Sequence, residues 1–518
     1  MPNTLALIVL LGWPLVAALF FRKLPVPAAL CWSIVGGYLL IPTRVEIDLP
    51  LLPALDKTLM PSLAAAVMCV IAAKAQNKAR RQARQARTDR PEPRAAVGMR
   101  HRQTVPVPNM AFRHSRGGVA FKLLLLLVVA TPFFTVLTNK EALYYGPTYL
   151  SGLRLYDSFS MVLEALVVVL PFLLARRYLA TPQAHVTLMR VLCLAALAYS
   201  LLALFEIRMS PQLNRWVYGF FPSSFAQHIR NGGFRPLVFL EHGLRLGIFL
   251  SMAILSAVAV WRQTRAMPSV GYLLAVAWLF MTLVLSKNLG ALGITFMLLP
   301  IAAFLGVRGQ MLIAAGLAAV VLLYPMLRGS NLIPVENVYS LAQSVSEERA
   351  QSLKTRLDNE DALLEHASRK PLFGWGKWGR SRLFDPRSGR DISTTDGVWV
   401  IVIGTSGWFG YVGTFGLLTL PILLLGLRRK TLGLSLVSSG LALVLAADLV
   451  DLIPNSGLTP VTWLVAGALA GRYEVAPATG VGQEPQPNSR RAGARGVSSR
   501  RRSPRDLFQR DAREQRPL

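Results

Sequence analysis

A series of apolar runs is the feature that most restricts how this chain of 518 residues can fold. Each run holds about 16–20 mostly apolar residues, which is the length that a helix needs to cross a bilayer. The sequence therefore predicts an all-α, polytopic membrane protein with about thirteen transmembrane helices and one large, partly helical loop outside the membrane. The expected spans are 4–21, 25–41, 57–73, 119–137, 158–175, 186–204, 246–261, 270–285, 290–305, 311–327, 398–426, 432–451 and 459–471.

The placement of basic residues predicts the side of the membrane on which each connection lies. The net charge is +29, and the basic segments between the spans all fall on one side. Lys and Arg are enriched in cytoplasmic loops, so this side is expected to be the cytoplasm. Arg22 and Lys23 follow the first run instead of preceding it, so we expect an uncleaved first helix with its N-terminus outside.

Four regions follow from this pattern. Residues 1–73 are expected to form the N-terminal transmembrane helices, 74–117 a basic cytoplasmic loop, 118–471 a transmembrane core, and 472–518 an Arg-rich cytoplasmic tail. The loop and the tail are expected to be mostly disordered and to attract anionic membrane lipid, with docking of a partner protein as the alternative. No nucleic-acid-binding pattern accompanies the charge, so no nucleic-acid partner is expected. The three cysteines lie in apolar spans and are expected to be packed thiols.

The external loop 328–397 is expected to be folded. A capping box formed by Ser344 and Glu347 predicts a helix start, and Pro371 predicts its end. Asp358, Asn359, Glu360 and Asp361 could together bind a divalent ion, but on a helix these side chains point in different directions, so they are expected to form a solvated face. A thin apolar stripe is expected on the helix at Leu353, Leu357 and Leu364.

Glycines mark the sequence that follows this helix. Residues 371–379 form a turn segment rich in Gly and Trp. The next apolar run, 398–426, is long for a single span and has Gly404, Gly407 and Gly410 inside it. We therefore expect this run to be tilted or broken.

Charged residues gather at the predicted outer boundary of the membrane. Charges at such depths are costly, so they are usually paired or functional. Taken singly, each charged residue is expected to form an ion pair with another charged residue or to anchor a helix at the lipid headgroups. Asp396 also suits the N-cap of the helix that follows it. Taken together, on one face of the membrane, they suggest a site. Phosphate groups suit Arg and Lys clusters, and the candidate phosphate ligands are Arg235, Arg245, Lys287 and Arg356.

An acceptor hydroxyl needs a carboxylate or imidazole that can take its proton. The candidate catalytic residues of this kind are Asp396, His366, Glu241 and His242. Fixed cations lower the barrier for a pyrophosphate leaving group by stabilising its developing negative charge. Neither a metal site nor a cofactor is expected, and no P-loop, GxSxG or HExxH motif is present.

The order of these features resembles the O-antigen ligase/polymerase superfamily of bacterial envelope glycan enzymes, over residues 119–470. Two differences stand out. Lys287 lies where the family usually has Arg, and Asp396-Gly397 lies where its ligases carry His-Asn. The similar stretches are 234–235 with 241–243, 286–292, Arg356 with 371–376, and 395–399 with 407–410.

The resemblance implies a metal-independent membrane glycosyltransferase of the bacterial inner membrane, with loop 328–397 in the periplasm. Its donor would be an undecaprenyl-pyrophosphate-linked glycan, and its acceptor a second lipid-linked glycan (polymerase) or a lipid core (ligase). A chain-length regulator is a further partner that it implies. The missing His-Asn favours a polymerase.

The alternative function is a secondary transporter or flippase of lipid-linked oligosaccharide, with a structural scaffold third. A carrier places polar residues near mid-membrane in broken helices. Glu164 and Asp448 are the residues that fit this pattern best. Most polar residues lie instead at the outer boundary, which favours an enzyme.

Overall fold

The computed structural model describes residues 2–48, 53–88, 116–230, 232–263, 269–330, 340, 343, 347–394 and 396–475. This part of the chain is mostly helical, as predicted. Its helices are α1 (Thr4–Lys23), α2 (Val26–Leu40), α3 (Leu59–Thr88), α4 (Arg116–Leu137), α5 (Leu155–Tyr178), α6 (Pro182–Met209), α7 (Leu213–Tyr218), α8 (Gly243–Gln263), α9 (Ser269–Leu285), α10 (Leu289–Phe304), α11 (Val307–Gly329), α13 (Glu347–Ser368), α14 (Val398–Leu427), α15 (Leu436–Asp451) and α16 (Pro460–Glu474). Two antiparallel hairpins pair β1 (Leu143–Tyr145) with β2 (Thr148–Leu150), and β3 (Ile229–Arg230) with β4 (Gly233–Phe234).

Long apolar helices identify the chain as a multi-pass membrane protein. Among the described residues, eight helices are long and apolar enough to cross a bilayer: α1, α3, α4, α5, α6, α8, α11 and α14. Shorter apolar helices are α2, α9 and α10. A helix overlaps each of the thirteen predicted spans, but α15 and α16 have only 16 and 15 residues. The number of crossings therefore stays a prediction.

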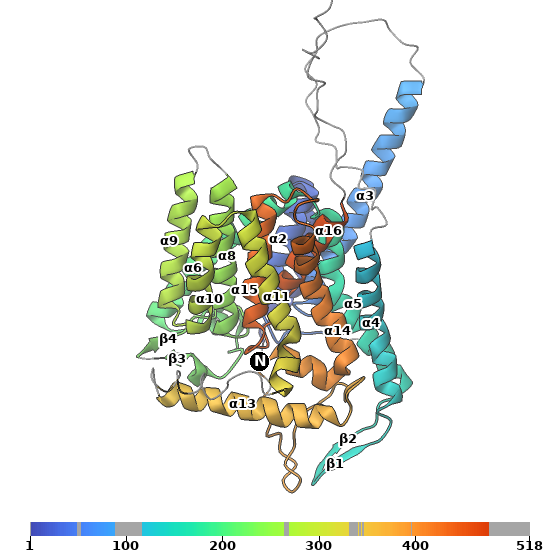
Figure 1. Ribbon diagram of the computed structural model, residues 1–518, viewed down its shortest axis with the longest axis vertical. Coiled ribbons are helices and arrows are strands. Elements are labelled where there is room, and N and C mark those ends of the chain that lie inside the picture. Colours follow the sequence, from blue (N-terminus) through green and yellow to red (C-terminus); the bar gives the residue numbers. More distant parts are fainter. Residues whose placement is uncertain are drawn as a thin grey trace, which may run out of the picture. The chain divides into compact units, whose positions relative to one another are not determined.

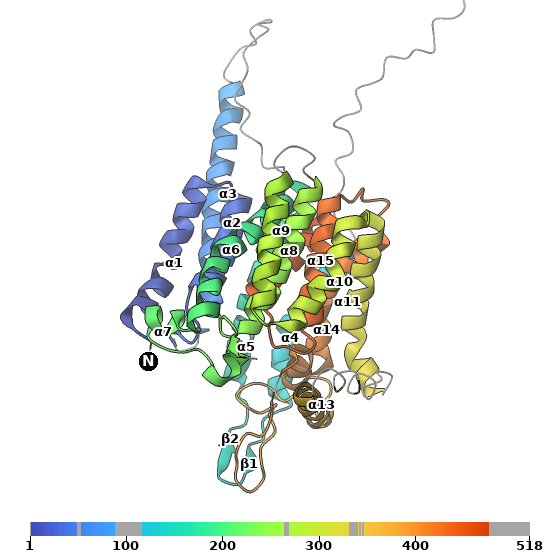
Figure 2. The ribbon, with the colours of Figure 1, turned by 90° about the vertical axis from the view of Figure 1, so that its left-hand side faces the viewer.

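The long helices stand side by side, and α13 lies across one end of them (Figures 1 and 2). The same end carries the β1–β2 hairpin and α7. We call this end of the bundle the loop face. The far end of α3 extends from the opposite end of the bundle (Figure 1).

Helices α8 and α15 lie at the centre of the bundle. Every residue from Leu246 to Val260 in α8 is buried. Small residues allow close packing here, as is common between membrane helices. A Cβ atom on Gly440 of α15 would lie 2.6 Å from the Cβ of Ala259 in α8. Arg245 near the start of α8 and Asp451 at the end of α15 line the site described below.

Helix α14 is broken at Gly407, as the glycine pattern predicted. Gly407 has φ 64° and ψ −169°, which a residue with a side chain adopts only with strain. The turn segment after α13 inserts at the break. The backbone N–H of Trp375 donates to the carbonyl of Gly404 at 2.8 Å, and that of Trp408 donates to the carbonyl of Pro371 at 2.8 Å. The break therefore fixes the end of the external loop to the membrane bundle.

Helix α13 confirms the predicted loop helix but corrects its buried face. Ser344 and the side chain of Leu353 lie outside the described part of the chain, and Leu357 and Leu364 are only partly buried. Among the described side chains of α13, the buried ones are Ala350, Glu360, Leu363, His366 and Ala367. The prediction that 358–361 is solvated is thus wrong for Glu360, which is 5% exposed. An apolar stripe alone could not indicate this face, because α13 packs through small and polar side chains.

The basic loop begins later than predicted. Helix α3 continues to Thr88, so residues 74–88 are helical, because Ala, Arg, Gln and Lys are good helix formers. The rest of the predicted disordered loop and nearly all of the tail lie outside the described residues. At the start of the tail, α16 continues to Glu474, which forms an ion pair with Arg176 at 2.5 Å. The three cysteines, Cys31, Cys69 and Cys193, are free and buried, as predicted.

Candidate functional site

A cavity of about 550 Å³ opens at the loop face, and we call it the cationic chamber. Its wall combines the α2–α3 connection, the segment before α8, α13, the residues before α14 and the end of α15. Six of the eight predicted site residues line it, although they lie up to 161 positions apart in the sequence. These six are Arg235, Glu241, His242, Arg245, Arg356 and Asp396.

Positive charge dominates the cationic chamber. Five arginines line it, against three carboxylates. Such a cluster suits a ligand with several negative charges, because guanidinium groups hold phosphate or carboxylate oxygens in bidentate pairs. The arginines are Arg44, Arg230, Arg235, Arg245 and Arg356, and the carboxylates are Glu241, Asp396 and Asp451.

Arg235 lies in the most strongly cationic part of the wall. Burial, together with Arg230 and Arg356, lowers its pKa to about 10. Its buried Nε has no hydrogen-bond partner among the described residues. Gly243 leaves room for it, since a Cβ there would lie 2.6 Å from Arg235 Cδ. An anion bound here would relieve the repulsion between the arginines and supply the missing acceptor.

Lys287 lies behind the wall and not in it. Its backbone has φ 55°, in the tight connection between α9 and α10. Lys287 Nζ donates to the carbonyl of Arg230 at 2.8 Å. The Lys287 carbonyl accepts a long 3.5 Å hydrogen bond from Arg235 Nη2. Lys287 is thus placed to position Arg230 and Arg235, whereas the sequence predicted direct contact with phosphate.

Two of the chamber's carboxylates form ion pairs with arginines. Asp396 Oδ2 lies 3.2 Å from Arg356 Nε, and Glu241 Oε2 lies 2.8 Å from Arg245 Nη2. The prediction that Asp396 caps the next helix is wrong, because Gly397 is the N-cap of α14. The aspartate side chain is held by Arg356 of α13 instead.

The chamber's imidazole is unsuited to hold a proton. Burial, His228 and the nearby arginines lower the pKa of His242 to about 3. Its Nδ1 accepts a hydrogen bond from the backbone N–H of Leu244 at 3.2 Å. A proton acceptor works best when its pKa lies near the working pH, so His242 is a poor candidate.

His366 lies away from the cationic chamber. Its ring stacks on Trp375 with centroids 4.4 Å apart, and its Nε2 lies 3.2 Å from the carbonyl oxygen of Arg380. Burial lowers its pKa. These contacts join α13 to the turn segment, which is a structural role.

Four charged residues of this region were not predicted as site residues. Arg44, Arg230 and Asp451 line the chamber, and Glu360 is buried near Arg356 and Asp396, whose charges act on it. Asp451 accepts a hydrogen bond from Asn455 Nδ2 at 3.0 Å and forms no ion pair with any described residue. Its position at the outer end of an apolar run was visible in the sequence. Arg44 gave no such signal, because it lies in an irregular connection.

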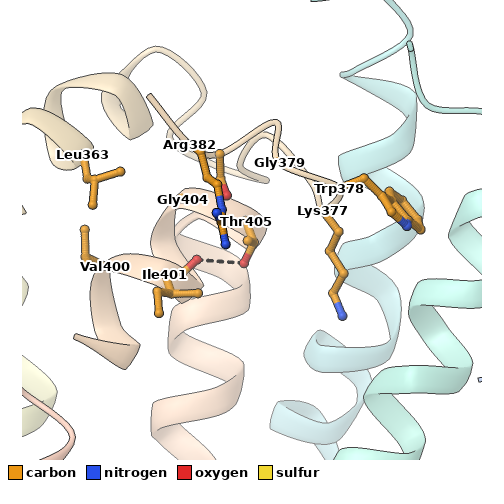
Figure 3. A pocket seen from close by; sticks show the side chains of 10 residues that line it. Leu363, Lys377, Trp378, Gly379, Arg382, Val400, Ile401, Gly404 and Thr405 are labelled. Atoms are coloured by element: carbon orange, nitrogen blue, oxygen red, sulfur yellow. Dashed lines mark hydrogen bonds between the residues drawn. The ribbon is translucent and has the colours of Figure 1, made fainter. Parts of the chain in front are cut away.

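A second cavity, of about 280 Å³, lies between α13, α14 and residues 377–382 (Figure 3). Leu363 and Val400 face each other on one side, and Lys377 and Trp378 lie on the other (Figure 3). Lys377 forms an ion pair with Glu164 of α5. This contact places Glu164 against the external loop, so it does not provide the mid-membrane group that a carrier needs.

Comparison with known proteins gives no matching family model and no similar curated protein. The function is therefore argued from the chain's own residues.

Proposed function

We propose that this chain is a membrane glycosyltransferase of the O-antigen ligase/polymerase type, acting as a polymerase. About thirteen helices would cross the bacterial inner membrane, with the loop face in the periplasm. The donor would be an undecaprenyl-pyrophosphate-linked glycan and the acceptor a second lipid-linked glycan, with a chain-length regulator as a further partner. The cationic chamber carries this proposal, because it gathers five arginines at one end of a membrane bundle, where a lipid-linked anion can reach them.

In the proposed reaction, an acceptor hydroxyl oxygen attacks the anomeric carbon of the donor. The bond between that carbon and the pyrophosphate oxygen breaks, and its electron pair leaves with the pyrophosphate. Arg235 and Arg356 would stabilise the negative charge that develops there. The hydroxyl proton would pass to a carboxylate of the chamber. No metal ion takes part in this scheme.

Asp396 is the proposed proton acceptor, because Arg356 orients its carboxylate toward the same cavity. Replacement by Asn keeps the shape but removes the ability to take a proton. We expect Asp396→Asn to fold and to lose polymerisation by about 10²-fold or more. Full polymer length from this variant would reject Asp396, and Asp451→Asn and Glu241→Gln would then test the other two carboxylates of the cavity.

The proposal is tested by glycan chain length in a deletion strain that carries plasmid-encoded variants. Arg235→Ala and Arg356→Ala should each reduce long-chain product by about 10²–10³-fold, as expected for loss of one fixed donor to the leaving group. Arg369→Ala is the matched control, since Arg369 lies beyond the end of α13 with its side chain 67% exposed. Normal chain length from both chamber variants, at normal protein level, would contradict the proposal.

The carrier alternative depends on Asp448. This residue is buried in α15, and its Oδ2 has no hydrogen-bond partner among the described residues. A carrier would move lipid-linked oligosaccharide across the membrane without changing its length. Loss of the chain should then leave the repeat unit on the cytoplasmic side, whereas loss of a polymerase leaves single units on the periplasmic side.

A further inference from the structure

A smaller cavity of about 220 Å³ adjoins the cationic chamber, and we call it the inner chamber. The two cavities share Glu241 and Arg245 in their walls. The inner chamber lies among α2, α5, α16 and the connection that precedes α3. At this size it is below the usual range for a whole drug-sized ligand, so it suits one end of a larger ligand whose other end lies in the cationic chamber.

The polar groups of the inner chamber are the Lys57 ammonium, the Arg245 guanidinium, the Trp463 indole N–H, four hydroxyl groups and one carboxylate, that of Glu241. Lys57 Nζ donates to the carbonyl of Phe239 at 2.9 Å and lies 5.6 Å from the centre of the Tyr38 ring. Thr43 Oγ1 and Trp463 Nε1 are buried, and neither has a hydrogen-bond partner among the described residues. A buried donor without a partner costs about 1–3 kcal/mol. A ligand with acceptor oxygens would satisfy these groups.

Part of the wall is apolar. Val168 of α5, Leu240, Leu458 and Trp463 of α16 line the inner chamber. A free inorganic anion would gain nothing from these side chains, whereas the hydrocarbon of an amphiphile would bury surface against them. The combination of one ammonium group, unpaired donors and an apolar wall fits the point where a phosphate joins a lipid chain.

We propose that the inner chamber binds the lipid-proximal phosphate of a polyprenyl pyrophosphate, with Lys57 as its counter-ion and the first isoprenoid unit against the apolar wall. Arg245 lines both cavities, so one pyrophosphate group can reach from one chamber to the other. This inference rests on the proposed function. It adds a residue that lies outside the 119–470 stretch that resembles the superfamily.

Lys57 makes this binding dependent on pH. Burial and Arg245 lower its pKa to about 7, while Glu241 and Asp56 act in the opposite direction; the neutral Tyr38 ring faces it from α2. Part of its surface remains accessible, as expected for a cavity wall. A phosphate nearby favours the ammonium form and raises this pKa. Affinity should therefore fall as the pH rises above 7, by at most about tenfold per pH unit.

The test is direct binding to the purified, full-length chain at pH 6 and pH 8. Three probes are compared: farnesyl pyrophosphate, inorganic pyrophosphate and phosphatidylglycerol. At pH 6, Lys57→Met should weaken farnesyl pyrophosphate binding about tenfold or more, as expected for loss of a hydrogen bond to a charged group. Its effect on inorganic pyrophosphate should be smaller, so the preference for the isoprenyl ligand falls. Lys57→Arg, which stays charged, should bind more tightly than the natural chain at pH 8.

Controls separate the two proposals. Lys140→Met removes an exposed lysine at the loop face and should change nothing. Thr43→Val removes one unpaired hydroxyl and should weaken farnesyl pyrophosphate binding even if Lys57→Met proves unstable. If Arg235→Ala and Arg356→Ala abolish binding but Lys57→Met and Thr43→Val do not, the inner-chamber inference is wrong and the proposed function stands. Equal losses for all three probes, or no isoprenyl binding by the natural chain, would overturn the inference.

Discussion

Replacing Glu360 by Gln should change how the stability of the protein depends on pH. Glu360 lies on the buried face of α13 and is 5% exposed, and its Oε2 has no hydrogen-bond partner among the described residues. Burial raises its pKa to about 7. The positive charge of Arg328 lowers this pKa, and the negative charges of Asp361 and Asp396 raise it. The folded protein therefore binds this proton more tightly than the unfolded chain does.

The size of the effect follows from the pKa. A rise from an ordinary value of 4.5 to about 7 corresponds to about 3 kcal/mol, since a tenfold change in an equilibrium is about 1.4 kcal/mol. This stability is fully present below about pH 4.5 and is lost as the pH rises through 7. Glutamine cannot ionise, so the Glu360→Gln variant keeps its stability at alkaline pH.

Thermal unfolding of the purified protein in detergent, at pH 5 and pH 8, measures this effect. The natural chain and Glu360→Gln should unfold at similar temperatures at pH 5, and the variant should be the more stable at pH 8. Glu365→Gln is the matched control on the same helix, because the Glu365 side chain is 78% exposed. If the unfolding temperatures of the natural chain and of Glu360→Gln depend on pH in the same way, Glu360 does not carry a raised pKa in the folded protein.

Two further predictions concern the fold. Gly407→Ala would place a Cβ atom 2.3 Å from the carbonyl carbon of Leu372, at a residue with positive φ. This substitution should therefore destabilise the protein by about 1–3 kcal/mol. Gly293→Ala is the control, because open space surrounds Gly293, and thermal unfolding should show a loss of stability for Gly407→Ala alone. A cysteine at Ser388 should react with a membrane-impermeant thiol reagent in whole cells, and one at Thr431 should not, because the basic segments predict opposite sides. The reverse labelling would invert the proposed orientation.

The helices were predictable because each apolar run carries its own signal. Length and hydropathy are local properties, so every expected span coincides with a helix. The break at Gly407 was also visible, since glycines cluster in that run. The insertion of Trp375 beside the break could not be predicted from the sequence, because it depends on backbone hydrogen bonds between distant segments.

The charged residues that line the cationic chamber were largely predictable, but their geometry was less so. Charged side chains at a membrane boundary are costly, which is why Arg235 and Arg356 could be selected from the sequence. The direction of each side chain depends on packing. Thus the ring of His366 stacks on Trp375, and Glu360 is buried. Lys57 was predicted as the first residue of a span, but it lies just before α3 and lines a cavity.

Reconstitution with a lipid-linked glycan tests the central claim most directly. Purified protein in liposomes would be given a polyprenyl-pyrophosphate-linked oligosaccharide, and both the glycan length and the released polyprenyl pyrophosphate would be measured. A polymerase should give longer glycans and release one polyprenyl pyrophosphate for each bond formed, and both products should be lost in Arg235→Ala and Arg356→Ala. Movement of the lipid-linked glycan across the bilayer, without any change in length or release of pyrophosphate, would contradict it.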